Sequence, residues 1–232
     1  MTPKDRLIVA LDVASADAAR ALVARLSGHV GMFKIGSQLF TAAGPDFIHE
    51  LTARGEKVFL DLKYHDIPNT VANAVASASR LGVALVDVHA LGGRAMIEAA
   101  VGALPALGTR LLAITILTSH DEATLGQIGV AGGVAGAVKR LALLAKDAEA
   151  DGVVASPQEV ALLREACGSD FLIVTPGIRP VGVATGDQAR AATPAAARAA
   201  GADYIVVGRP ITEAANPGEA ADAIVRELEA AG

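Results

Sequence analysis

The sequence predicts an α/β protein built as one domain, a (β/α)8 TIM barrel over residues 1–232. Short apolar runs recur at intervals of roughly 25 to 30 residues and alternate with Ala-rich helical segments, which indicates a parallel sheet. Eight such units are present, the number that closes this barrel, and 232 residues lie within its one-domain range. Polar residues also gather at one end of the apolar runs, as they do in barrel enzymes.

The predicted elements alternate along the chain without a linker or a change of composition. The strands are Leu7–Leu11, Met32–Ile35, Val58–Leu62, Leu85–Val88, Leu111–Leu117, Gly152–Ala155, Phe171–Thr175 and Tyr204–Val207. The helices are Ala16–Leu26, Phe47–Arg54, Thr70–Leu81, Arg94–Leu104, Val134–Ala150, Gln158–Ala166, Pro194–Ala200 and Ala220–Ala230. An open, doubly wound sheet is the alternative, but no glycine-rich dinucleotide fingerprint follows the first strand.

Composition excludes several classes of protein. Hydrophobic residues make up 52% of the chain and charged residues 19%, which predicts a folded core and not a disordered chain. The net charge is −5 and lysine and arginine do not cluster, so we expect neither nucleic acid nor a membrane surface as the main partner. The single cysteine, Cys167, rules out a disulfide framework and a cysteine metal cage. The N-terminus has no signal-peptide pattern and no apolar run reaches a membrane span, so a soluble cytoplasmic protein is expected.

The residues that close the predicted strands are mostly polar. In chain order they are Asp12; Lys34; Asp61 with Lys63; His89; Thr118 with Ser119; Ser156; Pro176 with Gly177; and Gly208 with Arg209. The carboxyl ends of barrel strands form the face that carries active sites. A ring of polar groups with charges at three consecutive strand ends therefore predicts an active site there.

The segment DLKYHDIPNT, Asp61 to Thr70, holds two carboxylates and a lysine within six residues. Strand side chains alternate between faces, so Asp61 and Lys63 should share the inner face with Phe59. Asp66 follows where the chain turns. The structural alternative is an ion pair together with an Asp66 cap on the next helix. We favour a functional site, because buried charges are costly unless they are paired, and paired charges at a strand end are typical of functional sites.

Lys63 is expected to be a proton donor. A Schiff-base lysine needs a depressed pKa, whereas Asp61 and Asp66 should both raise the pKa of Lys63. Lys34, one strand away, would complete a chain of alternating charge. The alternative that Asp61 and Asp66 bind magnesium is weakened by an ammonium group placed between the two carboxylates.

A phosphate site is predicted after the last two strands, where barrels commonly bind this group. Gly208 permits close backbone approach and Arg209 can bind phosphate bidentately. The long segment from Gly177 to Thr193, which carries Arg179, Gln188 and Arg190, is expected to close over the ligand as a lid. The alternative for Gly208 and Arg209 is an ordinary turn with a solvated arginine. The alternative for the long segment is a variable surface loop. His65 is assigned to a loop and His89 to a supporting position behind the site.

Taken together, these residues resemble the orotidine 5'-phosphate decarboxylase family of bacterial type across essentially the whole chain. The segment DLKYHDIPNT matches the signature Asp-x-Lys-x-x-Asp-Ile-Pro-Asn-Thr without a departure. Further matches are ALD ending at Asp12, FKIG around Lys34, LTS at Leu117–Ser119, TPGIRP at Thr175–Pro180, Gln188, and VVGRPI at Val206–Ile211. The glycine–arginine element is weak alone, because it recurs in many phosphate-binding barrels.

The resemblance implies a lyase without cofactor or metal, which converts orotidine 5'-monophosphate to UMP and CO2 in the last step of de novo UMP synthesis. It also implies a homodimer whose sites are shared across the interface. Lys63 would protonate C6 of the pyrimidine beside Asp61, within an array Lys34–Asp61–Lys63–Asp66. The implied ligand contacts are Asp12 and Lys34 to ribose, Thr118 and Ser119 to the base, Gln188 to base and phosphate, and Arg179 and Arg209 to phosphate. Asp66, Ile67 and Thr70 would reach the partner's site. Asp61, Pro176 and Gly208 are further substrate-binding residues that the resemblance implies.

Two rivals stay open. One is a related magnesium-dependent barrel of the keto-gulonate-phosphate decarboxylase or hexulose-phosphate synthase type, which shares Asp-x-Lys-x-x-Asp but lacks the following Ile-Pro-Asn-Thr. The other is a noncatalytic barrel that only binds a phosphorylated ligand, for which a lysine between two acids is unnecessary.

Overall fold

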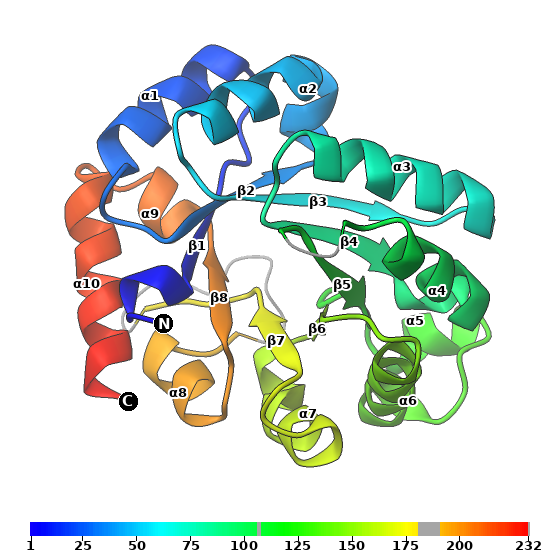
Figure 1. Ribbon diagram of the computed structural model, residues 1–232. Helices are drawn as coiled ribbons and strands as arrows, with labels where there is room; N and C mark the ends of the chain where they lie inside the picture. Colours follow the sequence, from blue (N-terminus) through cyan, green and yellow to red (C-terminus); the bar gives the residue numbers. More distant parts are fainter. Residues whose placement is uncertain (106–107, 181–190, 232) are drawn as a thin grey trace.

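The computed structural model describes residues 1–105, 108–180 and 191–231. Within these residues, eight parallel strands pair in chain order and close into a barrel, with β1 hydrogen-bonded to β8. Figure 1 shows the strands as a ring with the helices around it. The strands are β1 (Leu7–Ala10), β2 (Met32–Gly36), β3 (Val58–Tyr64), β4 (Leu85–His89), β5 (Arg110–Ile114), β6 (Gly152–Val154), β7 (Leu172–Thr175) and β8 (Tyr204–Val207). The predicted (β/α)8 barrel is confirmed.

Helices follow the strands and cover the outside of the barrel (Figure 1). They are α1 (Ala16–Leu26), α2 (Ser37–Ala53), α3 (Pro68–Arg80), α4 (Arg94–Gly102), α5 (Glu122–Gln127), α6 (Gly133–Asp147), α7 (Val160–Cys167), α8 (Pro194–Ala199), α9 (Arg209–Thr212) and α10 (Pro217–Ala230). Single 3₁₀ turns are η1 (Lys4–Arg6), η2 (Ala90–Gly92) and η3 (Pro157–Glu159). None of the helices in the described part of the chain has the length and apolar content of a membrane-crossing helix.

Alternation along the strands divides the core into two layers. In β1, Ile8 and Ala10 pack inside the barrel, while Leu7 and Val9 pack outward with residues of the covering helices. The inner layer consists of Ile8, Ala10, Met32, Phe59, Leu85, Leu112, Val174, Tyr204 and Val206. It fills the barrel with apolar side chains, so polar groups on the same faces are confined to the strand ends.

Strand β3 contains an irregularity at its carboxyl end. Leu60 pairs with Val86 of β4 and Tyr64 pairs with Val88, so residues 61–63 stand opposite Asp87 alone. Lys63 lies in the left-handed backbone region at φ 52°. This β-bulge changes the direction of the segment that carries the predicted charged residues.

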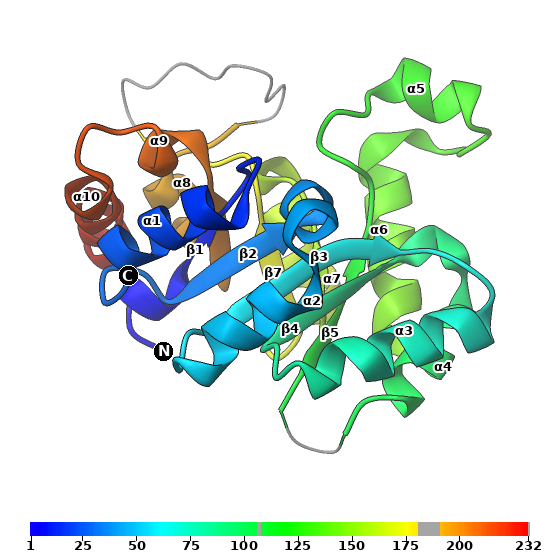
Figure 2. The same ribbon diagram turned by 90° about the horizontal axis from the view of Figure 1, so that it is seen from above.

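Several element boundaries differ from the sequence prediction. The strand expected to reach Leu117 ends at Ile114, because β6 ends at Val154 and leaves no partner to continue the ladder. Helix α2 begins ten residues earlier than predicted, at Ser37 and not Phe47, and is broken at Gly44 with φ 67°. Helices α5 and α9 were not predicted, because they are too short to show a helical period. Figure 2 shows both of them at the same end of the barrel.

Candidate active site

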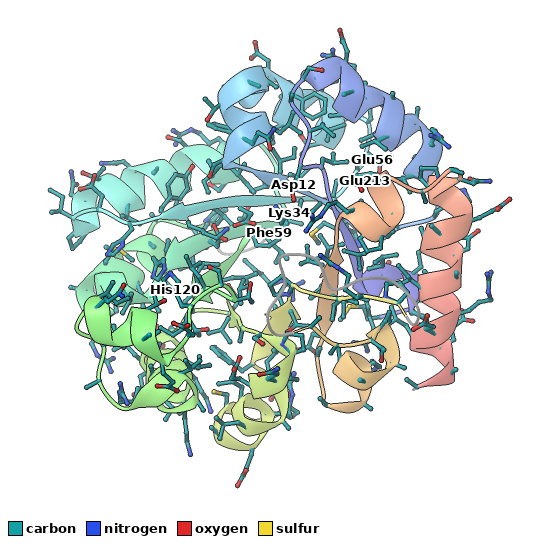
Figure 3. The ribbon with its side chains drawn as sticks, turned by 180° about the vertical axis from the view of Figure 1, so that it is seen from behind. Asp12, Lys34, Glu56, Phe59, His120 and Glu213 are labelled. Carbon is teal, nitrogen blue, oxygen red and sulfur yellow. The ribbon has the colours of Figure 1, made fainter. Side chains whose placement is uncertain are left out.

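Four charged side chains form a continuous chain at the carboxyl ends of β1, β2 and β3. Lys34 Nζ lies 3.2 Å from Asp12 Oδ1 and 3.1 Å from Asp61 Oδ2. Lys63 Nζ contacts the other oxygen of Asp61, Oδ1. Asp61 therefore meets one ammonium group with each carboxylate oxygen. Figure 3 shows Asp12 and Lys34 together at the middle of the barrel, next to Phe59.

The strand pattern explains why these charges face inward. Lys34 stands between Phe33 and Ile35, which pack outward, and Asp61 follows Leu60, which also packs outward. The predicted inner face of Phe59, Asp61 and Lys63 is confirmed, since all three line one cavity. Side chains of Lys34 and Asp61 are each only 11% exposed, whereas Lys63 is 39% exposed and reaches the opening.

Mutual pairing keeps the buried groups charged. Burial acts to lower the pKa of Lys34, but the charges of Asp61 and Asp12 outweigh burial and raise it. Burial likewise acts to raise the pKa of Asp61, but Lys34 and Lys63 hold that pKa well below its usual range. The site therefore contains a carboxylate and a buried ammonium that are both ionised at neutral pH.

Asp87 is a buried acid to which the sequence pattern gave no role. It is completely buried, and its Oδ1 accepts the backbone N–H of Lys63 at 2.7 Å. Burial, and next the negative charge of Asp61, raise the pKa of Asp87 well above its usual value. Its sequence signal was a lone acid on the inner face of an apolar strand, between Leu85 and His89.

A first cavity, of about 260 Å³, lies beside Asp61 and Lys63. Apolar side chains make most of its wall, and its remaining polar residues come from the segment after β5. The lining residues are Lys34, Phe59, Asp61, Lys63, Ile114, Ile116, Leu117, Thr118, Ser119, Val154, Ala155, Pro176 and Val206. A flat, largely apolar ring with polar edges fits such a pocket, with its reacting atom near Lys63.

A second cavity, of about 440 Å³, adjoins the first and shares Lys34, Pro176 and Val206 with it. Its other lining residues are Ala10, Asp12, Val13, Gly177, Arg179, Gly208, Arg209, Thr212 and Glu213. Burial, and next the charge of Arg209, lower the pKa of Arg179, so the two guanidinium groups are close enough to repel. A bound phosphate would relieve this repulsion, and guanidinium groups match its oxygens geometrically.

The remaining predicted site residues do not contact the charged chain or lie outside the described residues. Asp66 is exposed and makes no ion pair with Lys63 among the described residues, so the expected array stops at Lys63 within one chain. Asp66 does not cap α3 either: Ile67 is the capping residue, and Asp66 Oδ1 accepts the N–H of Ile67 at 2.6 Å. Ile67 is 66% exposed and Thr70 is also exposed. Gln188 and Arg190 lie outside the described residues.

Two histidines stack behind the charged chain. The rings of His65 and His89 are 5.4 Å apart and inclined by 22°. Burial, and next the nearby charges of His65 and Lys63, lower the pKa of His89 to about 4. His89 is thus a neutral group at physiological pH. His65 directly follows β3, as the prediction of a loop position required.

The potential metal ligands are dispersed. Among the residues that the structure describes, no three histidine, cysteine or acidic side chains gather in a metal-binding arrangement. Both oxygens of Asp61 face ammonium groups, which compete with a cation for the same lone pairs.

Comparison with known proteins gives consistent matches over nearly the full chain. Residues 5–224 match the family described as "Orotidine 5'-phosphate decarboxylase / HUMPS family". A protein of Halorhodospira halophila named orotidine 5'-phosphate decarboxylase is 57% identical, with 98% of this chain and 97% of that protein aligned. A protein of the same name from Syntrophotalea carbinolica is 53% identical, with 98% and 96% aligned. The crystal structure of orotidine 5'-phosphate decarboxylase from Lactobacillus acidophilus superposes with a TM-score of 0.85 at 43% identity, covering 96% of this chain and 98% of that one.

Proposed function

The chain belongs to the orotidine 5'-phosphate decarboxylase / HUMPS family, and we propose that it converts orotidine 5'-monophosphate to UMP and CO2 in pyrimidine biosynthesis. The observation that carries this proposal is the Asp61 carboxylate with an ammonium on each oxygen, at the wall of a largely apolar cavity. The adjoining cavity, with Arg179 and Arg209, supplies a place for the 5'-phosphate.

Lys63 is the proposed proton donor. When the bond from C6 to the carboxylate breaks, CO2 leaves and the electron pair stays on C6. The Lys63 ammonium then transfers one proton to C6, and neutral Lys63 regains a proton from water. A carbanion at C6 has little resonance stabilisation, so a fixed ammonium beside the developing charge lowers the barrier.

Asp61 and Lys34 hold Lys63 in place. In the proposed complex Asp61 lies beside the leaving carboxylate, and Lys34 with Asp12 contacts the ribose hydroxyls. Thr118 and Ser119, at the edge of the first cavity, contact the base. Asp12, Lys34, Asp61 and Lys63 are paired with one another through their side chains, and fixed pairing of this kind is the preorganisation that electrostatic catalysis requires.

The phosphate contacts are proposed for Arg179, Arg209 and the backbone at Gly208, with Pro176 at the wall shared by both cavities. The lid expected over this group, Gly177 to Thr193, stays a prediction from the sequence, because residues 181–190 lie outside the described part of the chain. The contact of Gln188 with base and phosphate rests on the family resemblance alone.

A homodimer is proposed, in which Asp66, Ile67 and Thr70 of one subunit complete the site of the other. Its support is the position of these three residues on the surface directly after the charged strand β3. The large exposed side chain of Ile67 is of the kind that is buried in interfaces. The cytoplasmic location stays a prediction from the sequence.

The test is the loss of orotidine 5'-monophosphate absorbance in the presence and absence of EDTA. We expect turnover that EDTA does not change. Metal-dependent turnover, or turnover of a hexulose phosphate with magnesium in place of orotidine 5'-monophosphate, would assign the chain to the rival magnesium-dependent reaction.

Replacing Lys63 separates catalysis from binding. We expect Lys63→Ala to bind UMP in calorimetry but to lose about 1000-fold or more in kcat, because both the proton donor and the positive charge are removed. Lys57→Ala is the matched control, since Lys57 is exposed just before the other end of β3. Retained turnover in Lys63→Ala would remove Lys63 from the proposed role.

A further inference from the structure

The bulge in β3 surrounds a buried carboxyl group that the proposed reaction does not use. Residues 61–63 of β3 stand opposite Asp87 alone, between the pairs Leu60–Val86 and Tyr64–Val88. Leu85, two residues before Asp87, packs inside the barrel, so Asp87 points to the same interior. The carboxyl group thus lies beneath Asp61 and Lys63.

The two oxygens of Asp87 have different surroundings. Oδ1 accepts the backbone N–H of Lys63 at 2.7 Å. No donor from the described part of the chain reaches Oδ2, although the atom is buried. The adjacent group across the bulge is the Asp61 carboxyl, and each of the two carboxyl groups alters the pKa of the other. A hydrogen bond between them would satisfy Oδ2. Two carboxyl groups can form such a bond only if one of them carries a proton.

The proton belongs on Asp87. Asp61 meets Lys34 with one oxygen and Lys63 with the other, so ionised Asp61 is well compensated. Asp87 has no cationic side chain within ion-pair distance among the described residues, and burial raises its pKa. With its proton, Oδ2 becomes a donor and is no longer unsatisfied.

We propose that Asp87 is a positioning residue that acts as a neutral carboxylic acid, donating a hydrogen bond to Asp61 while accepting one from the Lys63 backbone. It thereby fixes the carboxylate and the ammonium relative to each other. The inference rests on the proposed function, because these are the two groups assigned to the chemistry at C6.

The local geometry explains why such a link is needed. Lys63 is held at φ 52°, a region that residues with a side chain rarely adopt, and its N–H points to Asp87. The charged and titratable groups around Asp87 are Asp61, Lys63 and Tyr64 on β3 and His89 on β4, whereas its register partner on β5 is Leu112. An ionised Asp87 would compete with Asp61 for the Lys63 ammonium.

Two substitutions distinguish this role from simple packing. We expect Asp87→Val to lower kcat about 100-fold with KM changed only a few-fold, because a small misplacement of catalytic groups has an effect of that size. Asp87→Asn should recover kcat to within about 10-fold of the wild type, because an amide supplies both an acceptor and a donor. Thr109→Val is the control: it removes a buried hydrogen bond to Val83 just before β5, and should lower Tm without lowering kcat.

Infrared spectroscopy tests the proton directly. With ¹³C-labelled aspartate, the wild type at neutral pH should show an isotope-shifted carbonyl band of a protonated acid, and Asp87→Asn should lack it. The absence of this band in a wild type that decarboxylates the substrate overturns the inference, as does wild-type kcat in Asp87→Val. If Asp87→Val does not fold, a loss of 100-fold or more in folded Asp87→Asn overturns it. A wild type that shows the band but does not decarboxylate contradicts the proposed function and leaves the protonation state established.

Discussion

Lys34 and Asp61 illustrate how a buried charge is retained. Each side chain is only 11% exposed, and an isolated ion in such a place would lose its hydration and change its protonation state. Here each ion lies beside two side chains of opposite charge. Lys34 contacts Asp12 and Asp61, and Asp61 contacts Lys34 and Lys63. Such pairs seldom add much stability. Their benefit is that the carboxylate and the ammonium are oriented before the substrate arrives.

His89 gives a pH-dependent contribution to stability. Its pKa is about 4 in the folded protein, against 6.5 for an ordinary histidine. Below pH 6.5 the unfolded chain takes up a proton that the folded protein does not bind, so stability is lost as the pH falls from 6.5 toward 4. Because His89 is only half-buried, we expect a loss of about 1 kcal/mol between pH 7.5 and pH 5.

Urea unfolding at these two pH values, for the wild type and for His89→Gln, measures this contribution. The glutamine variant should lose less stability on acidification, because it cannot take up the proton. An equal loss in both proteins would show that other groups account for the acid sensitivity.

At the scale of elements, the bulge in β3 sets the geometry of the site. A regular strand would have paired Asp61, Leu62 and Lys63 with successive residues of β4, but the ladder skips from Leu60 to Tyr64. The extra residues change the course of the strand end, and the Lys63 backbone N–H is donated to Asp87. A bulge at the rim of a barrel is a common means of directing a side chain into a site.

The break in α2 provides a stability test at this scale. Gly44 has φ 67°, whereas Gly102 at the end of α4 has an ordinary helical backbone, and neither has a heavy atom within 4 Å of an added methyl group. We expect Gly44→Ala to destabilise the protein by about 1 kcal/mol and Gly102→Ala to stabilise it by about 0.5 kcal/mol. Urea midpoints of the two variants measure the difference. Equal shifts would mean that the left-handed backbone at Gly44 is not the controlling factor.

Local patterns were sufficient to predict most elements and the inner face of β3, because alternation along a strand depends only on neighbouring residues. Helix α1 was predicted with its observed bounds, and Lys34, Asp61 and Lys63 were placed together. The bulge and the role of Asp87 could not be predicted, since the register between β3 and β4 depends on contacts distant in sequence.

At the scale of the whole molecule, two cavities with different chemistry meet at one end of the barrel. The cavity beside Lys63 is mostly apolar, whereas charged groups line the other: the cations Lys34, Arg179 and Arg209 and the acids Asp12 and Glu213. They share Lys34, so a ligand that fills both must place its central portion at the charged chain. A nucleotide has this order of parts: base, ribose and phosphate. The two cavities together therefore favour a nucleotide over a small sugar phosphate.

The charged chain is incomplete within one subunit if Asp66 takes part in it. Asp66 is exposed and, among the described residues, is not paired with Lys63. A symmetric dimer would bring the same surface of a second subunit to the site, so that each active centre contains Lys63 from one chain and Asp66 from the other. Asp66 acting within its own chain is the alternative.

Complementation between two inactive variants separates these alternatives. Lys63→Ala and Asp66→Ala are co-expressed with different affinity tags, and the heterodimer is purified through both tags. If Asp66 acts across the interface, one of its two sites contains both intact residues, and about half of the wild-type kcat per dimer should return. If Asp66 acts within its own chain, both sites stay defective and the heterodimer is as inactive as the parent variants. The size of the recovered activity thus decides whether one barrel or two make the active centre.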